Sequence, residues 1–118
     1  MKGASDMAFD MSLDYANGTC LQGRIDITRA RIEEVFGAPL YDSTDNDEKV
    51  MTEWGIMFDD GTCATIYDWK RYEMGAVGFH EVYDWHIGGT SHDAMDKVTA
   101  VLLKRGGERD DWSYINNS

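Results

Sequence analysis

Three histidines are the first residues that could carry chemistry, because imidazole binds metals and transfers protons near neutral pH. His80, His86 and His92 follow one another at intervals of six residues. Metal sites on helices and strands use shorter spacings, together with a nearby acid or cysteine. We therefore expect no metal site, and the sequence indicates no other cofactor.

Asp84 and His86 share one face of a predicted strand, as the carboxylate and imidazole of a general base would. Such a base also needs a nucleophile. The nearest hydroxyls, on Thr90 and Ser91, are better explained as caps of the following helix, and Cys63 has no assigned histidine partner. The pattern favours a protein that is not an enzyme.

A second candidate site is the glycine-rich segment where that strand meets the helix. Gly88, Gly89, Thr90 and Ser91 could bind an anion there, because free backbone amides and the helix dipole point outward. Arg71 could supply the counter-charge for a nucleotide-like ligand. The segment is not a P-loop, because no lysine follows at the required position. A tight strand-to-helix turn is the alternative interpretation.

The composition is strongly acidic. Among 118 residues, 22 acids face 11 lysines and arginines, which gives a net charge of −11. No basic stripe is present that could neutralise phosphates, so direct binding to nucleic acid is not expected. The acids either serve solubility or form a surface complementary to a basic partner, such as the nucleic-acid groove of another protein. The acids assigned to that surface are Asp42, Asp45, Asp47, Glu48, Asp59 and Asp60.

The hydropathy pattern indicates a cytoplasmic protein with no membrane partner. No apolar run approaches the roughly 20 residues that span a bilayer, and the first residues carry acids where a signal peptide is apolar. Cys20 and Cys63 lie far apart, outside any metal-binding or redox motif, and are expected to be free thiols.

The elements that position these residues fit one domain over 18–106, between a flexible arm at 1–17 and a tail at 107–118. Strands are predicted in CLQGRIDI (20–27), MTEWGIMF (51–58), TCATIYDW (62–69) and EVYDWHI (81–87). One helix is expected between Thr28 and Gly37, and another between Thr90 and Gly106. The order β-α-β-β-β-α predicts a two-layer α+β fold, with an antiparallel sheet of about four strands and both helices on one face.

The turn between the two middle strands decides which side chains share a face. A three-residue loop with a left-handed Gly61 pairs Trp54 with Ile66 and collects the apolar side chains on one face. A two-residue turn would place Trp54 opposite Tyr67 instead and shift every side chain of one strand to the other face. We prefer the longer, bulged turn.

In that register the face away from the helices carries aromatic, methionine and acidic side chains, which is typical of a binding hot spot. The residues assigned to it are Met57, Tyr67, Trp69, Asp84 and His86. The alternative is that the N-terminal arm or a second copy of the protein covers this face. The tripeptide Tyr-Asp-Trp occurs twice, and strand parity places its first copy on the open face and the aromatic residues of its second copy, Tyr83 and Trp85, in the core.

Four segments carry a resemblance to known sequences. They are GTCLQG (18–23), EEVFGAP (33–39), TEWGIMFDDGTCATIYDWK (52–70) and WHIGG (85–89). In these segments the chain resembles a group of small uncharacterised acidic proteins encoded by bacteriophages and prophages. The resemblance implies no established activity and no catalytic residues.

Together these observations predict a non-enzymatic phage-type protein that binds and inhibits a host protein with a basic surface. A nucleic-acid-processing or anti-phage defence enzyme would fit, with the carboxylates in its basic groove and Tyr67 and Trp69 as anchors. One alternative is a protein that sequesters a nucleotide-like signal at Gly88–Ser91. A third is a structural or assembly protein of a virion, which would form homo-oligomers.

Overall fold

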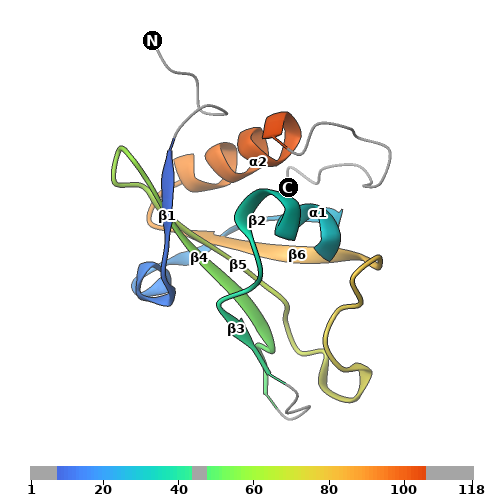
Figure 1. Ribbon diagram of the computed structural model, residues 1–118. Helices are drawn as coiled ribbons and strands as arrows, with labels where there is room; N and C mark the ends of the chain where they lie inside the picture. Colours follow the sequence, from blue (N-terminus) through green and yellow to red (C-terminus); the bar gives the residue numbers. More distant parts are fainter. Residues whose placement is uncertain (1–7, 44–47, 106–118) are drawn as a thin grey trace.

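The computed structural model describes residues 8–43 and 48–105 as one sheet with two helices (Figure 1). The strands are β1 (Phe9–Met11), β2 (Cys20–Thr28), β3 (Tyr41–Asp42), β4 (Thr52–Phe58), β5 (Cys63–Tyr67) and β6 (Val82–Gly89). The helices are α1 (Arg29–Phe36) and α2 (Asp93–Arg105), with 3-10 turns η2 (Leu13–Ala16) and η3 (Tyr72–Met74).

The sheet is antiparallel and has six strands, two more than predicted. Its order is β1-β4-β5-β6-β2, and β3 also pairs with β4. The two additional strands are only three and two residues long. They share the outer edge of β4, where β1 pairs with its end and β3 with its start. The predicted α+β class, the antiparallel sheet and the two helices are confirmed.

The turn between β4 and β5 has the predicted bulged geometry. Trp54 pairs with Ile66 and Ile56 with Ala64. Gly61 has a φ of +91°, which a residue with a side chain rarely adopts. This register places Trp54, Ile56, Ala64 and Ile66 on the same, fully buried face.

Both helices lie on that buried face (Figure 1). The Thr28 hydroxyl caps α1 by accepting a hydrogen bond from the backbone of Arg31, as predicted, and Gly37 follows the helix with a φ of +85°. Helix α2 starts at Asp93, three residues after Thr90, whose hydroxyl bonds to the backbone of Cys63 instead. No helix in the described part of the chain has both the length and the apolar composition to cross a membrane.

Residues 9–17, which were predicted to belong to a flexible arm, pack on the sheet instead. β1 pairs with β4, and the backbone of Ser12 bonds to Gly55. A side chain at Gly55 would overlap the Ser12 carbonyl oxygen, so glycine permits η2 to lie directly on the sheet. Because Gly55 alternates with the buried Trp54 and Ile56, η2 covers the middle of the face opposite the helices.

Candidate functional site

Beyond η2, the face opposite the helices carries three side chains that contact one another, Tyr67, Trp69 and His86, called here the aromatic cluster. The ring centroids of Tyr67 and His86 are 5.4 Å apart, and Trp69 lies 6.2 Å from Tyr67 and 6.1 Å from His86. Tyr67 and His86 are opposite each other on β5 and β6. Trp69 follows the end of β5 and is 40 % exposed. The sheet thus presents one indole to solvent on a base of two half-buried rings.

Charged side chains surround the aromatic cluster. Arg24 pairs with Asp84 at 3.5 Å, and the ammonium of Lys70 lies 5.7 Å from the centre of the Trp69 ring. Burial and the charge of Arg24 lower the pKa of His86, which favours its neutral imidazole. Burial and the nearby Asp84 carboxylate raise the pKa of Asp26, which faces Asp84 across β2 and β6. Asp26 and Asp84 thus form a close pair of carboxyl groups beside the cluster.

The backbone that carries Trp69 is fixed from the core side. Asp68 is fully buried, and its Oδ1 atom accepts hydrogen bonds from the backbone of Met51 at 2.8 Å and Thr52 at 3.1 Å. The Tyr83 hydroxyl accepts a hydrogen bond from the Trp69 backbone at 3.1 Å. These bonds hold the exposed indole on a defined backbone.

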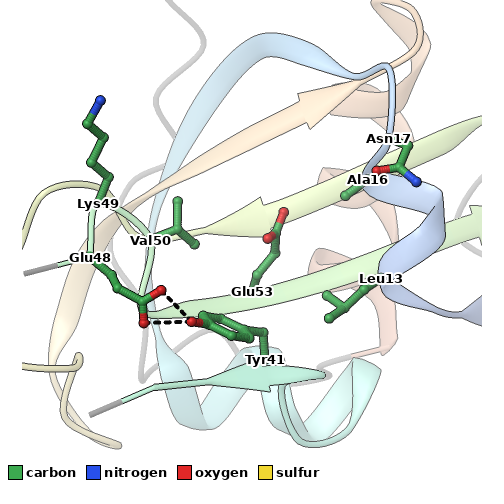
Figure 2. Close-up of a pocket in the computed structure, with 8 residues that line it drawn as sticks. All are labelled: Leu13, Ala16, Asn17, Tyr41, Glu48, Lys49, Val50 and Glu53. Carbon is green, nitrogen blue, oxygen red and sulfur yellow. Dashed lines mark hydrogen bonds between the residues drawn. The ribbon is translucent and has the colours of Figure 1, made fainter. Parts of the chain in front are cut away.

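Next to the cluster lies a groove of about 450 Å³, called here the Glu53 groove (Figure 2). It is lined by Leu13, Ala16, Asn17, Tyr41, Glu48, Lys49, Val50 and Glu53. One side comes from η2 and the other from β3 and the segment before β4. Glu53 is opposite Tyr67 in the β4–β5 pairing, so the groove lies beside the aromatic cluster.

Two carboxylates of the groove have different environments. The Glu48 carboxylate accepts hydrogen bonds from the hydroxyls of Tyr41 and Ser43, each at 2.6 Å, and these bonds lower its pKa. Burial raises the pKa of Glu53, although a 2.6 Å hydrogen bond from the Thr65 hydroxyl opposes this effect. Glu48 is therefore held ionised, whereas the charge on Glu53 is partly desolvated.

The other residues predicted to bind a partner do not join this site. Met57 is near the opposite end of β4, where it lines a hollow of about 230 Å³ with Phe9 and Asp59. Asp42 pairs with Arg29 at 2.8 Å, and Asp60 pairs with Lys97 at 3.3 Å. The acids around the two ends of β4 therefore do not form one patch, and two of them already have internal cations. Asp45 and Asp47 lie outside the described residues.

The structure does not bring together the residues of the predicted anion site. Gly88 and Gly89 are buried inside β6, between β5 and β2. A side chain on Gly88 would meet Thr65, and one on Gly89 would overlap Ala94, so tight packing on both faces accounts for these glycines. Arg71 lies at the other end of β6, about 20 Å along the strand, where it pairs with Glu81 at 3.1 Å. Thr90 and Ser91 therefore lack the predicted counter-charge.

The histidines and cysteines are dispersed. His80 precedes β6 and contacts Phe79, whereas His92 precedes α2. Among residues 8–43 and 48–105, no group of three His, Cys, Asp or Glu side chains could hold a metal ion. Cys20 and Cys63 are free thiols. Tyr67, Asp84 and His86 share one face of the sheet, as predicted.

The sequence analysis missed Glu53, Tyr41 and Leu13. Strand parity could have found Glu53, because it alternates with the buried Trp54 and thus shares a face with Met57. Gly55, within a strand of large apolar residues, is a sign that another part of the backbone approaches closely. No comparable signal marks Tyr41, because β3 is too short for a periodic pattern.

Comparison with known proteins adds no family to this description. The chain matches no protein-family model, and no curated protein or solved structure is significantly similar to it.

Proposed function

We propose that this protein acts without catalysis, by binding another protein through the aromatic cluster. The observation that carries the proposal is Trp69, which stays 40 % exposed while η2 covers the middle of the same face. Contacts with Tyr67 and His86 orient its ring. An exposed tryptophan on a rigid base is typical of the anchors that dominate protein–protein interfaces.

The charge of the chain supports a partner with a basic surface. A net charge of −11 would speed the encounter with such a partner and make the affinity depend on salt. Glu53 and Asp84 lie on the same face as the cluster and would contact the partner directly. In line with the resemblance to phage-encoded proteins, the proposed partner is a host protein whose activity is blocked. A nucleic-acid-processing or defence enzyme fits this description.

The proposal is tested by capturing partners on immobilised wild-type protein and on the Trp69→Ala variant. Phe79→Ala is a matched control, because Phe79 is another exposed aromatic residue, 49 % accessible, in the turn before β6. Once a captured protein is purified, its dissociation constant is measured for all three chains. We expect Trp69→Ala to weaken binding by about 2 kcal/mol or more, roughly 30-fold in Kd, and Phe79→Ala to leave it unchanged.

Two results would contradict the proposal. One is equal affinity of the wild type and Trp69→Ala for every specifically captured protein. The other concerns charge, because binding between an acidic protein and a basic partner must weaken as salt is added. An affinity that does not change between low and high salt would contradict the proposed attraction between this acidic chain and a basic partner.

A further inference from the structure

The Glu53 groove contains carboxylates that no lysine or arginine pairs with among residues 8–43 and 48–105. Other acids on or near the sheet have internal partners: Arg29 pairs with Glu33 and Asp42, Lys97 with Asp60, Arg71 with Glu81, and Arg24 with Asp84. Within the described parts of the chain, the side-chain carboxylates of Glu48 and Glu53 accept hydrogen bonds only from hydroxyl groups. The groove therefore concentrates negative charge that nothing described in the fold neutralises.

Glu53 is placed to accept more hydrogen bonds than it receives. Its Oε2 atom accepts one hydrogen bond from Thr65, at 2.6 Å. A carboxylate has two oxygens with about four acceptor positions, so Glu53, which lines the groove, can accept further hydrogen bonds. Figure 2 shows the Glu53 side chain standing between η2 on one side and Tyr41 and Val50 on the other.

The one lysine of the lining does not occupy the groove. Lys49 is exposed, and its side chain points away from Glu53 and Tyr41 (Figure 2). Its backbone carbonyl accepts a hydrogen bond from Lys70, which fixes the main chain without directing the ammonium inward. The entrance to the groove is thus open to a cation from outside.

Apart from Asn17, the remaining lining is largely apolar and suits the stem of a long cationic side chain. Leu13, Ala16 and Val50 offer aliphatic surface, and the Tyr41 ring offers a flat one. Its hydroxyl is already bonded to Glu48, so the ring is held in place. A guanidinium matches this combination best, because it stacks on aromatic rings and bonds to carboxylates through a planar fork. At about 450 Å³ the groove is large enough for one such side chain.

We infer that the Glu53 groove binds an arginine side chain of the partner protein, an inference that rests on the proposed function. Glu53 and Tyr67 are neighbours across β4 and β5, so a segment that packs on Trp69 continues naturally into the groove. Tyr67 and Trp69 then supply the apolar anchor, while Glu53 and Glu48 select a basic residue beside it.

The test uses a probe that needs no knowledge of the partner. Nα-acetyl-arginine methylamide is titrated into the ¹⁵N-labelled full chain, and the backbone amide shifts are followed by NMR. The acetyl-citrulline analogue, which has the same shape without the charge, is the control ligand. We expect the arginine probe to shift the amides of Leu13, Val50 and Glu53 with a Kd on the order of 10 mM. Citrulline should bind at least about tenfold more weakly.

Two variants with opposite expected effects sharpen the result. Glu53→Gln keeps an acceptor for the Thr65 hydroxyl and should weaken arginine binding about tenfold. Lys49→Ala removes a cation from the rim and should strengthen binding about twofold. Asp96→Asn makes the same charge change as Glu53→Gln at an exposed position on α2, and should leave the Kd unchanged.

The inference is wrong if the arginine probe shifts no groove amides, if citrulline binds equally well, or if Glu53→Gln has the same Kd as the wild type. Its failure can be told apart from failure of the proposed function. Loss of partner capture by Trp69→Ala, together with no arginine binding, would refute the groove alone. Arginine binding in the groove, with capture unaffected by Trp69→Ala, would refute the aromatic anchor alone.

Discussion

The two Tyr-Asp-Trp segments have the same residues in inverse environments. In the first, Trp69 is 40 % exposed and Asp68 is fully buried; in the second, Trp85 is fully buried and Asp84 lies on the open face beside Arg24. The Trp85 indole donates a hydrogen bond to the Ile27 carbonyl in the core, at 3.1 Å. Trp69 has its contacts with Tyr67 and His86 on the surface.

The difference shows that strand parity, rather than the local sequence, decides which face of the sheet a side chain occupies. Tyr67 is opposite His86, and Ile66 is opposite Ile87, so alternate positions of β5 and β6 face opposite layers. Trp85 shares parity with Ile87, whereas Asp84 shares parity with His86. The following predictions test the tryptophans and the aspartates of these two segments.

The largest effect is expected at the tryptophans. Trp85→Ala removes a fully buried side chain that contacts Trp54 and Tyr83, and should lower the free energy of unfolding by about 3–5 kcal/mol. Trp69→Ala should cost less than about 1 kcal/mol, because Trp69 is 40 % exposed and lies outside the core. Urea denaturation measures both, with an equal m-value as the check on comparable unfolding. Similar losses would mean that the two environments are not inverse.

For the aspartates, the larger loss of stability is expected in the first Tyr-Asp-Trp segment rather than in the second. Asp68→Ala leaves the buried backbone N–H groups of Met51 and Thr52 without their acceptor and should cost about 2–4 kcal/mol. Asp84→Ala removes only a half-exposed ion pair with Arg24 and should cost less than about 1 kcal/mol. Urea denaturation of both variants at neutral pH compares them, and a larger loss for Asp84→Ala would contradict the assignment.

The Asp68 effect should also depend on pH. Burial raises the pKa of Asp68 in the folded protein, so the folded state favours its protonated form. The stabilisation from this protonation is fully present below the ordinary aspartate pKa of about 4 and is lost as the pH rises through the raised value. The stability difference between wild type and Asp68→Ala should therefore shrink over that range. A difference that grows with pH would show that Asp68 is not desolvated.

The smallest effect concerns the carboxyl pair at the second copy. Asp84→Asn removes the negative charge opposite Asp26 and should move the pKa of Asp26 down toward its ordinary value. Burial still acts on Asp26, so part of the elevation should remain. Carbon-detected NMR titration of the Asp26 carboxyl measures the change in its pKa. Asp96→Asn is the control and should leave the pKa of Asp26 unchanged. An unchanged Asp26 pKa in Asp84→Asn would show that the two groups are not coupled.

The parts of the fold that follow from local sequence were predictable. The caps of α1, the bulged turn at Gly61 and the parity of β4, β5 and β6 all depend on residues close together in the chain. β1 and β3 were missed because two or three residues cannot show a period. Both strands exist because β4 offers them an edge, and this partner becomes visible only in the assembled sheet.

The same distinction applies to the site. The placement of Tyr67 and His86 followed from the sheet register, but the Glu53 groove depends on two segments, η2 and β3, that reach β4 from elsewhere in the chain. The anion site was assigned to Gly88–Ser91 because this segment was expected to present free backbone amides at the start of a helix, but Gly88 and Gly89 belong to β6. Packing against Thr65 and Ala94 explains them instead.

The strand order also has a consequence for synthesis of the chain. β2 is synthesised before the other long strands of this sheet, yet its neighbour in the sheet is β6, and Cys20 pairs with Gly89. Ile25 and Ile27 therefore have no strand partner until most of the chain has been translated. Pairing between such distant segments slows folding and leaves apolar strands exposed to chaperones in the meantime. A nascent chain that stalls before Val82 would contain the complete β4–β5 hairpin. It would lack β6, the strand that joins this hairpin to β2.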